Sequence, residues 1–139
     1  MKKIYFACSI RGGRQDSNIY ADLIEHIKIR ATVLTEIFAD KKLTSYGMNK
    51  PSDQIWQIDT NWIIQSDAII AEVSVPSLGV GYEIAFAESL NKPILALFRQ
   101  TEDKKLSAMI EGSPNTTTAY YSTTQEAKEI IDQFIRNIN

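Results

Sequence analysis

Apolar residues follow two alternating patterns along the chain. Short runs of consecutive apolar residues, such as KIYFACS at 3–9 and AIIAEVS at 68–74, are typical of strands buried on both faces. Between them lie segments whose apolar residues recur every three or four positions, the spacing of one helix face. These patterns predict strands at 3–9, 32–36, 68–74, 93–98 and 116–121, and helices at 17–30, 53–65, 79–91, 106–111 and 124–138. Ser52 is expected to cap the start of helix 53–65.

Strands that alternate with helices favour a parallel sheet covered on both faces. Five such strands in 139 residues predict an α/β fold, a three-layer flavodoxin-like or Rossmann-like sandwich with a five-stranded parallel sheet. No repeat or Pro/Ser-rich linker divides the sequence, so a single domain over 1–139 is expected. Ligands of such folds bind beyond the carboxyl ends of the strands, so the loops after the first three strands are the candidate binding segments.

Composition and charge exclude several classes of function. The 15 basic and 17 acidic side chains give a formal charge of -2, which offers no general attraction for a nucleic acid polymer or a membrane surface. The apolar stretch before Arg11 is too short for a signal peptide or a membrane span, so the cytoplasm is the expected location. Cys8 is the only cysteine and no His/Cys cluster has zinc spacing, so neither a metal nor a cofactor is expected.

The loop SIRGGR, after the first strand, has the composition of an anion site. Gly12 and Gly13 free the backbone N–H groups, Ser9 adds a hydroxyl, and Arg11 and Arg14 add guanidinium groups. The alternative is an ordinary glycine turn with solvated arginines.

The loop PSLGVG, after the third strand, adds Ser77 and a helix N-terminus, where the helix dipole favours negative charge. Its Gly79-x-Gly81 pattern resembles part of a dinucleotide fingerprint. The next strand, however, ends in Arg99-Gln100 and places no acid where a ribose diol would be held. A mononucleotide is therefore the better expectation.

Two carboxylates lie close to these loops. Glu83 falls in the first turn of helix 79–91, where it could simply complement the helix dipole. Asp59 shares the apolar face of its helix with Ile55 and Trp62, and burial raises the pKa of a carboxyl group, as a general acid requires. A structural alternative is that Asp59 caps a neighbouring loop. Two carboxylates flanking one bond are the arrangement of glycoside cleavage, so a nucleoside monophosphate is the expected substrate.

Several motifs together resemble one enzyme family. IYFACSIRGGRQD, VLTE, AEVSVPSLGVGYE, PILALF and LSAMI, in order from residue 4 to about 112, are similar to the 2'-deoxynucleoside 5'-phosphate N-hydrolases. These belong to the wider nucleoside 2-deoxyribosyltransferase group. The resemblance implies hydrolysis of the N-glycosidic bond of 2'-deoxynucleoside 5'-monophosphates, giving free base and 2-deoxyribose 5-phosphate.

The resemblance also implies roles for individual residues. Glu83 corresponds to the nucleophile, Asp59 to the acid that assists base departure, and Tyr5 to a tyrosine beside the sugar. The phosphate-binding set corresponds to Ser9, Ile10, Arg11, Gly12, Ser77 and Gly79, with Ser107 reaching the phosphate of the neighbouring subunit. A homodimer is therefore implied.

Some features leave alternatives open. Ile37 stands where related sequences read TEH, so the base preference is not fixed. A transferase that exchanges bases, or a non-catalytic nucleotide-binding domain, would use the same loops. Trp56 and Trp62 are expected to pack in the core, although an aromatic ring near the cleft could stack on a base.

Overall fold

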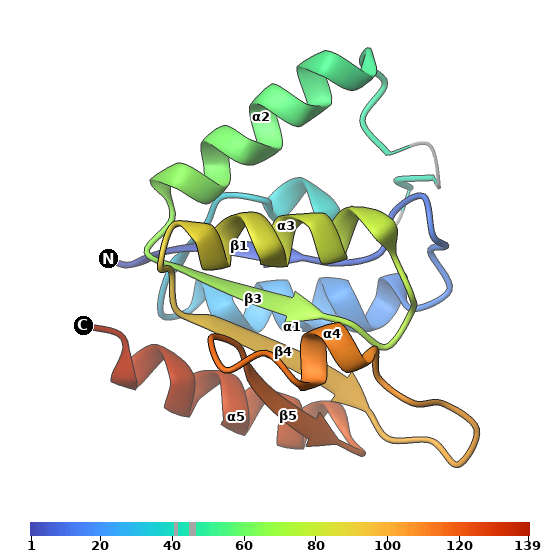
Figure 1. Cartoon of the computed structure of the whole chain (residues 1–139), viewed down its shortest axis with the longest axis vertical. Coiled ribbons are helices and arrows are strands. Elements are labelled where there is room, and N and C mark those ends of the chain that lie inside the picture. The colour runs from blue at the N-terminus through green and yellow to red at the C-terminus, as the bar shows by residue number, and fades with distance from the viewer. Residues whose placement is uncertain (41, 45–46) are drawn as a thin grey trace.

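A computed structural model describes residues 1–40, 42–44 and 47–139. Its core is one sheet of five parallel strands in the order β2-β1-β3-β4-β5. The strands are β1 (Lys3–Ala7), β2 (Thr32–Val33), β3 (Ala68–Glu72), β4 (Ile94–Arg99) and β5 (Thr117–Tyr121). The predicted α/β sandwich with a five-stranded parallel sheet is confirmed (Figure 1).

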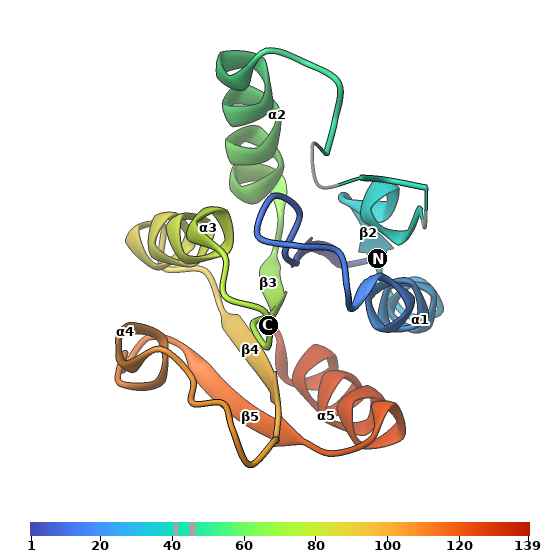
Figure 2. The ribbon, with the colours of Figure 1, turned by 90° about the vertical axis from the view of Figure 1, so that its right-hand side faces the viewer.

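Helices cover both faces of this sheet (Figure 2). One face carries α1 (Ser17–Lys28), the short 3-10 helix η1 (Glu36–Ala39) and α5 (Thr124–Asn137). The other face carries α2 (Ser52–Gln65), α3 (Leu78–Ser89) and the short α4 (Ala108–Glu111). No described helix is long and apolar enough to cross a membrane.

Alternation along β1 divides the core in two. Ile4 and Phe6 belong to the cluster beneath α1 and α5, whereas Tyr5 and Ala7 belong to the cluster beneath α2 and α3. Every residue of β3 is buried because this strand lies at the centre of the sheet with helices on both faces. This double burial explains why the strands read as continuous apolar runs.

Two local predictions are wrong at helix and strand ends. The second strand, predicted over 32–36, ends at Val33 because the Thr35 side chain, rather than strand backbone, bonds to the Phe6 backbone. The Thr35 hydroxyl donates to the Phe6 carbonyl at 2.8 Å and accepts from the Phe6 N–H at 2.9 Å. The chain then turns into η1. Ser52 is the first residue of α2 rather than its cap, and the cap position is taken by Pro51, which has no side-chain acceptor.

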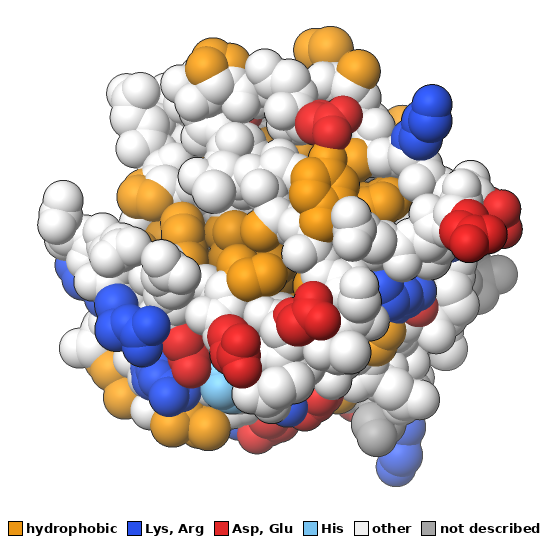
Figure 3. Space-filling model, turned by 90° about the horizontal axis from the view of Figure 1, so that it is seen from below, with side chains coloured by type: hydrophobic (Ala, Val, Ile, Leu, Met, Phe, Trp, Pro, Cys, Tyr) orange, Lys and Arg blue, Asp and Glu red, His pale blue; other side chains and the backbone are white. Residues whose placement is uncertain are grey.

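Charged side chains join α1 to α5 across the surface. His26 Nε2 lies 2.8 Å from Asp132, which also meets Arg30 at 3.2 Å, and Lys128 meets Asp22 at 2.8 Å. Figure 3 shows the single histidine in pale blue among acidic and basic side chains on the face seen from below. These contacts join the last helix to α1 and to Arg30, which follows α1.

Candidate active site

The carboxyl ends of the strands border a cavity of about 650 Å³ between α2, α3 and the loops after β1 and β3. It is lined by residues 8, 10–12, 38, 47–48, 52, 55–56, 59–60, 76–80 and 82–83. Its walls are mostly apolar, and the charged side chains among the lining residues are Arg11, Asp59 and Glu83. The structure therefore brings both predicted carboxylates and the predicted anion loops to one place.

Asp59 on α2 and Glu83 on α3 both line the cavity. Burial raises the pKa of Asp59 to about 6, and the buried Oδ1 atom of this carboxyl has no hydrogen-bond partner. Burial raises the pKa of Glu83 to about 8; the Tyr5 hydroxyl acts in the opposite direction, and the charge of Asp59 raises it further. Both acids thus lie in a poorly solvated site, and the charge of Asp59 acts on Glu83.

Tyr5 lies in the core beside Glu83, fully buried and behind the cavity surface. Its hydroxyl makes no hydrogen bond of normal geometry. Burial, followed by the charges of Glu83 and Asp59, raises the pKa of Tyr5 well above its ordinary value. The phenol therefore keeps its proton and can donate to the carboxylate beside it.

The loop after β1 is held against the loop after β3. A Cβ added to Gly12 would lie 2.6 Å from the Pro76 carbonyl oxygen and 2.8 Å from Ser9 Oγ, so only glycine permits this approach. Ile10 and Gly12 line the cavity, whereas Ser9 is fully buried behind its wall, with a hydroxyl that lacks a hydrogen-bond partner. The Ser9 hydroxyl and the backbone N–H groups of this loop could therefore donate hydrogen bonds to an anion.

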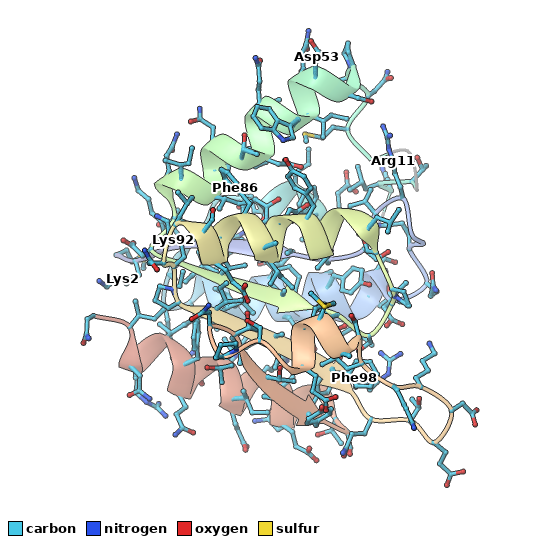
Figure 4. All side chains as sticks on the ribbon, viewed as in Figure 1. Lys2, Arg11, Asp53, Phe86, Lys92 and Phe98 are labelled. Carbon is cyan, nitrogen blue, oxygen red and sulfur yellow. The ribbon has the colours of Figure 1, made fainter. Side chains whose placement is uncertain are left out.

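Arg11 is exposed at the rim of the cavity and makes no hydrogen bond or ion pair with any residue that the structure describes. Figure 4 shows it extending from the loop on the side of the strand carboxyl ends. Arg14 does not share this role. Its guanidinium donates to the carbonyls of Phe38 at 3.1 Å, Asp40 at 3.3 Å and Leu43 at 3.3 Å, so it holds a loop rather than an anion.

The N-terminus of α3 forms the other side of the predicted anion site. Ser77 caps the helix, with its Oγ accepting from the Val80 N–H at 3.3 Å. A Cβ added to Gly79 would lie 3.8 Å from Ser77 Oγ and 3.9 Å from Glu83 Oε1. Gly79 thus lies between the N-terminus of α3 and the Glu83 carboxyl group.

Two residues singled out in the sequence lie elsewhere. Ser107 is exposed at the start of α4, where its Oγ accepts from the Met109 N–H at 3.3 Å, and it does not line the cavity. Ile37 is also exposed and outside the lining, while its neighbour Phe38 contributes to the wall. No group of three or more potential metal ligands occurs among the described residues.

Some cavity residues were not anticipated. Met48 lies in a polar region without periodicity, and Tyr82 immediately precedes Glu83 on an exposed helix face, so neither carried a recognisable pattern. Trp56 Nε1 donates to the Tyr82 hydroxyl at 3.2 Å across the cavity mouth. Trp62, in contrast, packs against the core beneath α2 and α3.

A buried polar network lies behind the loop after β3. The Glu72 carboxyl accepts from the Ser74 N–H at 2.7 Å, the Ser74 hydroxyl at 3.0 Å and the Tyr121 hydroxyl. Ser74 Oγ also accepts from the Arg99 N–H at 2.7 Å, and Arg99 pairs with Asp16 at 3.1 Å. The network ties the ends of β3, β4 and β5 to the loop after β1.

Known proteins resemble this chain in sequence and fold. A Rattus norvegicus protein named 5-hydroxymethyl-dUMP N-hydrolase is 47% identical over 112 residues, covering 79% of this chain and 69% of that protein. A Tetraodon nigroviridis protein of the same name is 37% identical over 139 residues, covering 97% and 98%. The structure of Clostridium botulinum CMP N-glycosidase, BcmB, shares the fold with a TM-score of 0.71 at 23% identity, covering 96% of this chain and 99% of that one.

The match to a whole family is equally extensive. Residues 4–135 match the family described as nucleoside 2-deoxyribosyltransferase. This range includes nearly all of α5 and all five strands, except for the first residue of β1. The family resemblance inferred from the sequence motifs is confirmed. The chain belongs to the nucleoside 2-deoxyribosyltransferase family.

Proposed function

We propose that this protein hydrolyses the N-glycosidic bond of 2'-deoxynucleoside 5'-monophosphates, releasing the base and 2-deoxyribose 5-phosphate. The observation that carries the proposal is one cavity in which two carboxyl groups adjoin an anion site made of a glycine loop, an arginine without a partner among the described residues and a helix N-terminus. Relatives named as N-hydrolases of a deoxynucleotide monophosphate support it.

The chemistry divides between the two acids. The Glu83 carboxylate attacks the anomeric carbon as the C–N bond breaks, and the departing base takes a proton from Asp59. The ionised Asp59 then removes a proton from water, which attacks the anomeric carbon and releases Glu83 as a carboxylate. Each acid thus returns to its starting form after one turnover, and no metal takes part in these steps.

The pKa values describe the protonation state of the two acids before substrate binds. In the protein alone the pKa of Asp59 is about 6 and that of Glu83 about 8, so near neutral pH the pair carries one proton, held mainly by Glu83. The reaction requires the other arrangement, with the proton on Asp59. Positive charge developing on the sugar beside Glu83 favours its ionised form, and the Tyr5 hydroxyl stabilises that form as well.

The test compares substrates and one variant. We expect release of free base from dGMP and much slower release from deoxyguanosine, because the nucleoside cannot use the anion site. Glu83→Gln should lower kcat by about 1,000-fold or more while nucleotide binding persists, since removing a nucleophile removes the chemical step. Chromatography of free base measures the first result and calorimetry with dGMP the second.

Two results would contradict the proposal. Equal cleavage of deoxyguanosine and dGMP would show that the loops do not hold the phosphate. A new nucleotide as the main product when a second base is supplied would identify a transferase instead.

The exposed apolar residues of α3 and α4 lead us to include a homodimer in the proposal. Leu78 is 97% exposed beside the cavity, and Met109 is 85% exposed on α4. Figure 2 shows these two helices side by side on one face of the sheet. A second copy seated on this face would cover both residues and bring its Ser107 toward the anion site.

A further inference from the structure

The cavity has one wall that phosphate binding and bond cleavage leave unused. If the phosphate lies at the Ser77 helix terminus and the anomeric carbon at Glu83, as the proposed function requires, the base must occupy the remaining space. That space is bordered by Ile10, Phe38, Met48, Ile55 and Trp56. No amide side chain lines the cavity, and its charged side chains are Arg11, Asp59 and Glu83, the last of which the proposed cleavage already uses.

Trp56 is placed to meet whatever enters this space. It lies three residues, nearly one helical turn, before Asp59 on α2, so both side chains project toward the same side of the helix. Its side chain is 52% exposed although it lines the cavity, whereas a tryptophan used only for packing would be covered.

The indole ring is also held at its edge. The indole N–H donates to the Tyr82 hydroxyl at 3.2 Å, and Tyr82 is itself 57% exposed on α3, next to Glu83. The only polar group of the indole is therefore satisfied within the protein, so the ring has only its apolar surface to offer a ligand. Two further hydroxyls of α2 line the cavity: that of Thr60 is engaged with the Trp56 carbonyl at 2.6 Å, and that of Ser52 lies at the exposed first residue of the helix.

We infer that Trp56 is the residue that recognises the nucleobase, by stacking on it rather than by hydrogen bonding to its edge, with Tyr82 fixing the indole. This inference rests on the proposed function for the direction in which the substrate lies. On this inference, the affinity for a base depends on how much of its aromatic surface contacts the indole. A two-ring purine should consequently gain more from Trp56 than a one-ring pyrimidine does.

Steady-state kinetics provide the first test. Stacking contributions of the usual size imply that Trp56→Ala raises KM for dGMP roughly ten-fold or more, and KM for dCMP by less. Trp56→Phe, which retains a ring, should recover part of the loss. We expect kcat to change little, and inhibition by 2-deoxyribose 5-phosphate, which lacks a base, to be unchanged. A uniform fall in kcat and in the affinity for both ligands would show a structural role and overturn the inference.

Tryptophan fluorescence provides a second test that does not depend on turnover. In a Trp62→Phe background, Trp56 is the only tryptophan, and dGMP should quench its emission strongly while 2-deoxyribose 5-phosphate should not. The matched Trp56→Phe variant, which keeps Trp62 packed in the core, should show little quenching by either ligand.

The two tests separate the possible failures. Quenching by dGMP without base release would leave the role of Trp56 standing and refute the hydrolase. Base release with an unchanged KM in Trp56→Ala, or equal quenching by both ligands, would refute the role of Trp56 and leave the hydrolase standing. Absence of both binding and turnover would refute both.

Discussion

Two glycines of the anion site differ in the space around them, and this difference predicts opposite effects of the same substitution. A methyl group at Gly12 would meet the Pro76 carbonyl oxygen at 2.6 Å, and a backbone atom cannot rotate away. We expect Gly12→Ala to lower the free energy of unfolding by about 1–3 kcal/mol, as overpacked sites do, and to weaken nucleotide binding as the loops separate. Urea denaturation and calorimetry with dGMP measure the two effects.

Gly79→Ala is the matched control. The added methyl group would lie 3.8 Å from Ser77 Oγ and 3.9 Å from Glu83 Oε1, which are ordinary contacts. Since alanine favours a helix over glycine by about 0.5–1 kcal/mol, stability should hold or rise. The methyl group nevertheless narrows the passage between the helix terminus and the carboxylate, so KM for dGMP should increase. Equal destabilisation by both substitutions would contradict this account of the two loops.

The two carboxyl groups predict how activity depends on pH. In the reactive state, the pair of carboxyl groups carries one proton. The pair loses this proton as pH rises through about 8 and gains a second one as pH falls through about 6, and both changes remove the reactive state. We therefore expect kcat/KM for dGMP to follow a bell-shaped curve with its maximum near pH 7, because this ratio reports the free enzyme. Asp59→Asn should reduce the rate and remove this shape. A rate that rises steadily to pH 9 would refute the shared proton.

At the scale of elements, the network around Glu72 joins three strand ends through one buried carboxyl group. Tyr121 on β5 donates to Glu72 and is buried, whereas its neighbour Tyr120 donates to Glu111 at the surface. Removing a hydrogen bond to a buried carboxyl group costs about 2 kcal/mol, so Tyr121→Phe should be clearly destabilised in urea. Tyr120→Phe loses the same type of bond in water and should unfold nearly as the parent does. Equal stability of the two variants would show that the network adds nothing.

Elements with strong periodicity could be predicted from the sequence, and those shaped by single side chains could not. The buried run of β3 and the apolar stripe of α5 each reflect a tertiary environment that repeats along the element. The end of β2 depends instead on Thr35 bonding to the Phe6 backbone, twenty-nine residues away. No local pattern contains such a contact.

The same distinction applies to the site. Glu83, Gly12 and Ser77 could be placed because strand ends of a parallel sheet converge on one edge, whereas Asp59 was indicated by its place on the apolar face of a helix and by the family resemblance. The binding of Arg14 to three carbonyls, and the pairing of Trp56 with Tyr82, depend on side-chain directions that a sequence does not record. The sequence therefore located the chemistry better than the shape of the cavity around it.

At the scale of the whole molecule, the apolar residues of α3 and α4 predict self-association. Met109→Glu should convert a dimer into monomers without loss of folding, since this side chain is exposed in the single chain. Ile29→Glu is the control, because Ile29 is exposed just after α1 on the opposite face of the sheet. Sedimentation velocity distinguishes the states. A parent protein that is monomeric at assay concentrations would refute the dimer.

The close approach of Gly12 to Pro76 has a practical consequence for altering this enzyme's substrate range. Gly12 in one loop lies against Pro76 and Ser77 in the other with no room for a side chain, so a change that moves one loop alters what the other can accommodate. Joint randomisation of the two, with the glycine retained, is the design that should recover new specificities.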